Sequence, residues 1–150
     1  MKVQRLNIGN VYATRQDETL ACIGLGSCVA VFLHDRQRKI GGGAHIFLPE
    51  GKESETMTKT HFVEGALSTL KSNLLALGAQ SENLRAFVFG GAALFSNVDS
   101  VGPRNVKAVN QWLTKNKIFV ALLEVGGTRP MSVSFQAKTG IPQRLNSKLE

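Results

Sequence analysis

A cysteine and a histidine are the residues whose types and spacing best fit chemistry in this sequence. Cys28 ends the segment GLGSC, and His45 follows seventeen residues later. A cysteine nucleophile needs its thiolate, and a nearby imidazole can provide it by accepting the thiol proton. Gly26 and Ser27, just before the cysteine, would let a substrate approach the main chain and leave N–H groups for an oxyanion. The spacing favours nucleophilic acyl chemistry.

Two apolar runs predict a hairpin that would bring this pair together. Residues 28–33 (CVAVFL) are rich in β-branched and aromatic types, residues 44–48 (AHIFL) form a second run, and DRQRK between them predicts a turn. Antiparallel pairing outward from that turn would place Cys28 near His45 or Ile46. Facing side chains on paired strands are about 5 Å apart.

Each of these residues also has a structural interpretation. A free cysteine in an apolar strand is often a small buried hydrophobic residue. His45 stands among apolar neighbours, as a hydrogen-bonded core histidine would. Ser27 is a weaker nucleophile candidate, because no second acid–base pair is evident. The residues alone leave both interpretations open.

Other site chemistries are poorly supported. The segment GLGSCV begins like a dinucleotide-binding fingerprint, but Val29 replaces its third glycine and the segment leads into a strand rather than a helix. No phosphate-binding GxxxxGK[ST] motif occurs, and the three histidines and two cysteines lack a known metal-ligand spacing. We expect neither a metal nor a cofactor.

The remaining pattern predicts one domain over residues 1–150 of mixed α+β class: a layered, β-sandwich-like core of hairpin strands flanked by two main helices. Apolar residues from Phe62 to Leu77 recur at helical spacing, and Gly78 stands where a C-terminal cap belongs. Pro103 predicts the start of a second helix. Further strands are expected at residues 2–8, 20–23, 84–89, 118–125, 131–135 and 141–145.

Composition narrows the function classes. Eighteen Lys and Arg against eleven Asp and Glu give a net charge of +7, spread along the chain. This favours acidic partners but predicts no nucleic-acid binding, because no basic helix or basic–aromatic platform occurs. No apolar run reaches the roughly 18 residues that span a membrane, and no signal peptide is evident, so we expect a cytoplasmic protein without membrane insertion. Two cysteines exclude a disulfide scaffold.

Five ordered motifs resemble the CheD family of chemoreceptor glutamine deamidases. They lie in residues 24–31, 41–49, 90–95, 101–106 and 126–133. The resemblance implies a layered α/β sandwich that hydrolyses glutamine side chains on chemoreceptors, with Cys28 as nucleophile and His45 as general base. It also implies methylesterase side activity and, for some relatives, a CheC-type phosphatase as partner. A non-catalytic docking module for that phosphatase or for a receptor is the alternative function.

One position departs from the family pattern. The family commonly has a threonine six residues before the nucleophile, where this chain has Cys22. A thiol is a poor hydrogen-bond partner compared with a hydroxyl. The orientation of His45 would then depend on a backbone carbonyl or another side chain, and Cys22 could simply fill a strand.

The later motifs contribute four predicted substrate- or partner-binding residues: Gly90, Gly91, Arg104 and Arg129. Receptor adaptation regions are rich in glutamate, so two arginines in glycine-containing loops could attract them. Anchoring a loop is the alternative role for each arginine.

Overall fold

The computed structural model describes residues 2–94 and 100–145. Its strands are β1 (Lys2–Arg5), β2 (Val11–Thr14), β3 (Glu18–Leu25), β4 (Val29–Asp35), β5 (Ile40–Ile46), β6 (Leu84–Gly90), β7 (Phe119–Val125), β8 (Met131–Gln136) and β9 (Ile141–Arg144). The helices are α1 (Val63–Ala76) and α2 (Val101–Lys115), with single 3-10 turns η1 (Lys59–His61) and η2 (Ser81–Asn83).

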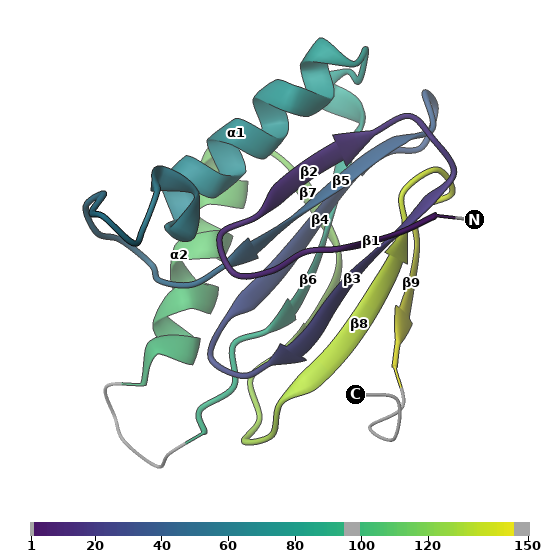
Figure 1. The fold of residues 1–150 in the computed structure, drawn as a ribbon. Coiled ribbons are helices and arrows are strands. Elements are labelled where there is room, and N and C mark those ends of the chain that lie inside the picture. The colour runs from purple at the N-terminus through teal and green to yellow at the C-terminus, as the bar shows by residue number, and fades with distance from the viewer. Residues whose placement is uncertain (1, 95–99, 146–150) are drawn as a thin grey trace.

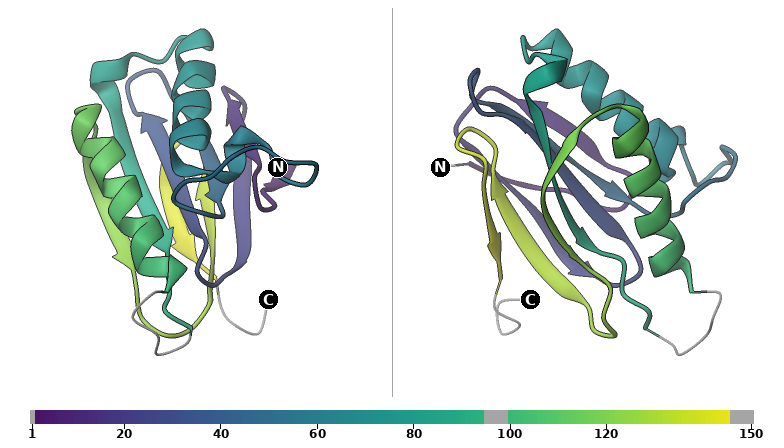
Figure 2. Two further views of the ribbon diagram at one scale, coloured as in Figure 1. Left: turned by 90° about the vertical axis from the view of Figure 1, so that its left-hand side faces the viewer. Right: turned by 180° about the vertical axis from the view of Figure 1, so that it is seen from behind.

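The elements form three layers. The central layer is a five-stranded sheet in the order β2-β5-β4-β6-β7, and a second sheet in the order β1-β3-β8-β9 packs on one of its faces. Both helices cover the opposite face (Figures 1 and 2). This confirms the predicted mixed class with layered sheets and two main helices. Pairs β1–β3 and β6–β7 are parallel, so hairpins build only part of each sheet.

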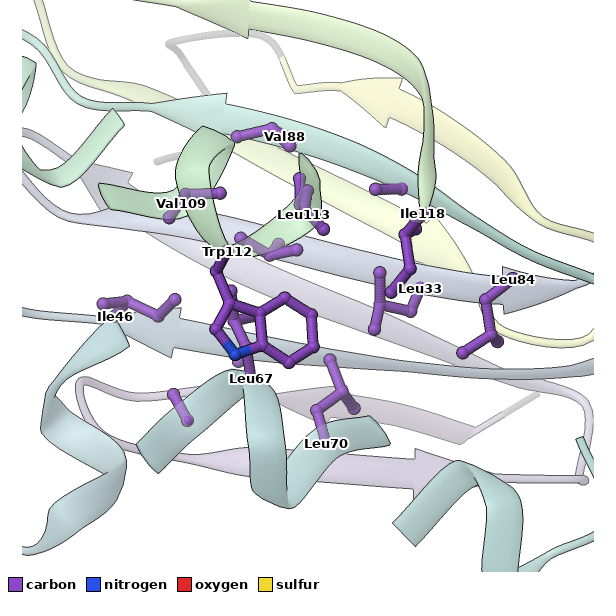
Figure 3. Packing of buried hydrophobic residues seen from close by; sticks show 14 of the residues in the cluster. Leu33, Ile46, Leu67, Leu70, Leu84, Val88, Val109, Trp112, Leu113 and Ile118 are labelled. Carbon is purple, nitrogen blue, oxygen red and sulfur yellow. The ribbon is translucent and has the colours of Figure 1, made fainter. Parts of the chain in front are cut away.

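Apolar side chains of the two helices form one core with the central sheet. Leu67 and Leu70 of α1 and Trp112 of α2 belong to one cluster with Leu33 and Val88 on β4 and β6. The Trp112 ring lies near Leu67 and Leu70 (Figure 3). The predicted helical stripe is thereby confirmed, because its spacing puts these residues on one face.

Gly78 occupies the predicted position after α1. It follows the C-cap Leu77 with φ of +111°. The next amide, of Ala79, donates to the carbonyl of Leu74 at 3.0 Å, which satisfies one of the free carbonyls at the helix end.

A second core fills the space between the sheets. Phe32 and Phe135 stack with ring centroids 4.8 Å apart, and Phe89 packs edge-on against Phe32. Cys22 and Cys28 belong to this cluster. The candidate nucleophile therefore lies at the inner face of the central sheet, on the side away from the helices.

Candidate active site

Cys28 stands in the connection between β3 and β4, where neighbouring main chain holds it. Its carbonyl accepts a hydrogen bond from the amide of Gly91 at 2.8 Å, and the carbonyl of Gly26 accepts one from Ala92 at 2.8 Å. A Cβ on Gly26 would come within 2.8 Å of the Leu94 side chain. The residues after β6 thus brace the chain around the thiol.

Gly90 and Gly91 combine positive φ angles with close contacts that leave no room for a side chain. Their φ angles are +102° and +68°, which side-chain-bearing residues rarely adopt. A Cβ on Gly90 would collide with the Cys28 carbonyl, and one on Gly91 would collide with Val106 of α2. The structure therefore gives both glycines a role in positioning Cys28. That they also contact substrate or a partner stays a prediction.

The main-chain amides of Ser27 and Cys28 have no hydrogen-bond partner in the part of the chain that the structure describes. Ser27 is half-buried, so its surroundings are partly open to solvent. Free N–H groups next to a nucleophile can bind a developing negative charge.

His45 is oriented by a main-chain carbonyl. Its Nδ1 donates to the Leu6 carbonyl at 2.9 Å, and the ring is buried. A carbonyl oxygen only accepts, so Nδ1 carries the proton of the neutral ring and Nε2 keeps a free lone pair. The Leu6 amide in turn donates to Ala21 at 2.8 Å, which fixes the position of this carbonyl. The ring is therefore held in the tautomer that can accept a proton at Nε2.

The register of β4 and β5 puts both residues on one face of the central sheet. His45 pairs with Ala30 and Ile46 pairs with Val29. Continued by one residue beyond β4, this register puts Cys28 opposite Phe47, one position from Ile46 and two from His45. Side chains alternate along a strand, so Cys28 shares the face of Ala30 and lies diagonally from His45.

Burial favours the neutral forms of both groups. Desolvation raises the pKa of the Cys28 thiol above its ordinary value. It also lowers the pKa of His45, against the hydrogen bond to Leu6, which raises it. The neutral thiol and the neutral imidazole are therefore the forms that burial favours.

Cys22 lies deep in the same cluster. It is fully buried on β3, opposite Val133, and burial, together with the nearby Cys28, raises its pKa to about 12. The Nδ1 of His45 bonds to Leu6, so the orienting partner is a backbone carbonyl, one of the alternatives left open for this departure from the family pattern.

Asn105 contacts the candidate site, and the sequence reasoning missed it. This asparagine of α2 is fully buried, and its Nδ2 donates to the carbonyls of Ser27 and Phe47, each at 3.0 Å. A signal was available: Asn105 precedes the inward-facing Val109 by four residues, which places a polar side chain on the buried stripe of the helix.

Arg104 and Arg129 are both exposed. Arg104 precedes Asn105 and lines a depression of about 270 Å³ with Pro49 and Glu50. Arg129 lines a groove of about 440 Å³ near the loop at Gly127, whose carbonyl accepts a hydrogen bond from Ala93 at 2.9 Å. Arg104 is thus next to a residue that contacts Ser27, whereas the segment of Arg129 contacts the residues after β6. The binding role of both arginines stays a prediction.

Neither a metal cluster nor a membrane helix is found in the described part of the chain. Within residues 2–94 and 100–145, no three His, Cys, Asp or Glu side chains gather closely enough to hold a metal ion. In the same residues, neither helix combines the length and apolar character that crossing a membrane requires.

A solved structure illustrates the likeness of the fold to known proteins. Neisseria meningitidis protein NMB0706, described as a DUF152 protein, matches with a TM-score of 0.50 and 13% identity, over 85% of this chain and 63% of that chain. At this identity the likeness concerns the fold alone.

Three proteins illustrate the sequence relatives. The chain is 34% identical to "Chemoreceptor glutamine deamidase CheD" of Halalkalibacterium halodurans (91% of this chain, 89% of that one) and of Thermotoga maritima (90% and 86%). It is also 34% identical to "Probable chemoreceptor glutamine deamidase CheD" of Methanococcus vannielii (92% and 91%). The family model "CheD chemotactic sensory transduction" matches residues 47–143. The chain therefore belongs to the CheD family.

Proposed function

We propose that this protein hydrolyses the side-chain amide of glutamine residues on chemoreceptors to glutamate, with Cys28 as nucleophile and His45 as base. The relatives carry the name of this activity. The observation that carries the residue assignment is the tautomer of His45, which has Nδ1 bonded to the Leu6 carbonyl and Nε2 free on the face that Cys28 shares.

The first half of the reaction forms a thioester. Nε2 of His45 accepts the thiol proton while the sulfur of Cys28 attacks the carboxamide carbon. The imidazolium then gives that proton to the departing nitrogen, so ammonia leaves rather than an amide anion. The N–H groups of Ser27 and Cys28 stabilise the oxyanion, a contribution of about 3 kcal/mol per donor in comparable sites.

The second half consumes one water molecule. His45 deprotonates the water, the hydroxide attacks the thioester carbon, and the Cys28 thiolate leaves and recovers its proton. The product is a glutamate carboxylate, and no cofactor takes part. The same two steps would hydrolyse a glutamate methyl ester with methanol as the leaving group, which is the side activity we propose.

Mass spectrometry of a soluble chemoreceptor fragment tests the proposal. After incubation with the wild-type protein, glutamine-containing peptides are expected to appear as their glutamate forms, with release of one ammonia per converted site. A methylated fragment, analysed in the same way, tests the esterase activity. A protein that binds the fragment but leaves every glutamine intact would contradict the enzymatic function.

We further propose that Arg104 and Arg129 attract acidic receptor segments. Raising the ionic strength from about 0.01 M to about 0.15 M shortens the Debye length from about 30 Å to about 8 Å, so kcat/KM should fall while kcat is kept. Arg104→Glu and Arg129→Glu should each weaken this dependence. Arg38→Glu, in the turn at the far end of β4, is the matched control. A kcat/KM that does not change with ionic strength would contradict electrostatic attraction.

Docking is the second candidate function. A groove of about 750 Å³ between α2 and β7 is lined by apolar residues such as Pro103, Val106 and Val125, with Lys107 and Lys115 at its side. We propose it as the surface for the CheC-type phosphatase that the family resemblance suggests. Binding of such a protein together with intact receptor glutamines would favour docking over catalysis.

A further inference from the structure

Asn105 is a buried polar residue that the proposed mechanism does not use. It lies in the N-terminal half of α2 and is shielded from solvent. Its two hydrogen bonds, to the carbonyls of Ser27 and Phe47, reach the main chain just before Cys28 and just after His45. Both partners only accept hydrogen bonds, so the contacts themselves assign which end of the side-chain amide is the NH₂ group.

Burying the oxygen of this side-chain amide costs free energy of folding. Oδ1 of Asn105 is buried and makes no hydrogen bond to any residue within the described ranges. An unpaired buried carbonyl oxygen loses its hydration without compensation. A leucine would avoid that cost and extend the apolar stripe of α2. The presence of the amide is therefore explained by the two main-chain carbonyls that its N–H groups bind.

The bond to Ser27 sets the direction of the Cys28 N–H. The Ser27 carbonyl and the Cys28 N–H belong to one planar trans peptide unit, in which they point in opposite directions. Rotating this peptide would break the 3.0 Å bond to Asn105. On the other side of Cys28, its carbonyl is held by Gly91 at 2.8 Å. Both peptide units that flank the thiol-bearing residue are thus fixed.

The bond to Phe47 ties the same side chain to the residue directly after β5. Phe47 follows His45 by two residues, and its own amide donates to the His61 carbonyl at 3.0 Å. Its carbonyl bonds to Asn105 at 3.0 Å. One side chain of α2 therefore links the main chain that carries the nucleophile to the main chain that carries the base.

We propose that Asn105 is a positioning residue that holds the Ser27–Cys28 peptide with the Cys28 N–H aimed at the developing oxyanion. This inference rests on the proposed function, in which that N–H is an oxyanion donor. The bond to the Ser27 carbonyl also polarises the peptide unit, which makes its N–H a stronger donor. Asn105 acts through Cys28 and does not touch the reacting atoms.

The test compares Asn105→Leu, which keeps the approximate size but removes both N–H groups, with Asn116→Leu. Asn116 is a matched control, because its Nδ2 donates to the Trp112 carbonyl at 2.8 Å at the far end of the same helix. We expect Asn105→Leu to lower kcat for receptor glutamine by about 10²- to 10³-fold, as for loss of one oxyanion donor. KM and the rate of Cys28 alkylation by iodoacetamide should stay near wild type, and Asn116→Leu should keep full activity.

An NMR readout makes the test independent of turnover. The amide shift of Cys28 should change in Asn105→Leu, whereas that of Gly24, which donates to Ser132 Oγ at 2.8 Å, should not. Unchanged kcat in a folded variant would overturn the proposal, as would an equal loss of kcat and alkylation rate. If Asn105→Leu does not fold, Asn105→Ser is tested in its place, and the same outcomes for kcat and alkylation rate decide. A wild-type protein that converts no glutamine refutes the proposed function, and the Cys28 shift then decides whether Asn105 fixes the peptide.

Discussion

Replacing Cys28 by alanine is expected to lower kcat/KM for receptor glutamine by at least about 10³-fold, as removal of a covalent nucleophile does in comparable enzymes. No thioester can form without the sulfur, and a water molecule in its place would have to attack an unactivated amide. Cys28 is only 8% exposed, so the smaller side chain should leave binding of the receptor fragment largely intact. Glutamate formation is followed by mass spectrometry at saturating and at low fragment concentration.

Cys22→Ala is the matched control for this experiment. Both thiols lie in the cluster between the sheets, but Cys22 is 0% exposed and has a pKa of about 12. Its loss should lower the melting temperature through a small cavity while kcat/KM stays near wild type. Equal losses of activity in both variants would show that the cluster, rather than one nucleophile, had been disturbed. Full activity of Cys28→Ala would refute the thioester mechanism.

Much of the fold could be predicted from periodicity, because most elements bury one face. The stripe from Phe62 to Leu77 and the runs around Phe32 and Phe89 carry that signal, and the structure has elements there. Strand β2 was missed. Its residues are half-buried except Thr14, so its sequence does not alternate between apolar and polar residues. It pairs mainly with the glycines of β5, which are not typical strand residues. Parallel pairing of β6 with β7 was not predicted either, although the strand–helix–strand order of β6, α2 and β7 is the usual sequence pattern of a parallel pair.

The site could be predicted only where side-chain types carry a signal. Cys28 and His45 are chemically informative residues, and the resemblance assigned their roles. The orienting group of His45 is the backbone carbonyl of Leu6, 39 residues away, and any residue at that position provides a carbonyl. Asn105 reaches across 78 and 58 residues to two further carbonyls. Such contacts depend on tertiary packing and leave little trace in local sequence.

Removing the imidazole of His45 should cost about 10²- to 10⁴-fold in kcat/KM, the usual range for loss of a general base. In His45→Ala the buried Cys28 thiol has no nearby acceptor for its proton, and its pKa is raised above the ordinary 9.0 by desolvation. Residual activity would then depend on the small fraction of Cys28 that is thiolate at the pH of the solution. It should rise about tenfold per pH unit through the neutral range. Steady-state kinetics from pH 5 to pH 9 measures this slope.

The pH dependence of wild-type activity should have a different cause from that of His45→Ala, and the wild-type activity should be higher. In the proposed mechanism His45 acts as a base in its neutral form, and burial lowers its pKa below the ordinary 6.5. Activity is therefore expected to be complete at neutral pH and to fall only as acid protonates the ring below pH 6.5. His34→Ala is the matched control, because His34 is also buried, has a lowered pKa and bonds the Lys138 carbonyl at 3.0 Å, at the far end of β4. If His45→Ala keeps the wild-type plateau at neutral pH with a fall only below pH 6.5, or if His34→Ala loses that fall, the titrating base is another group.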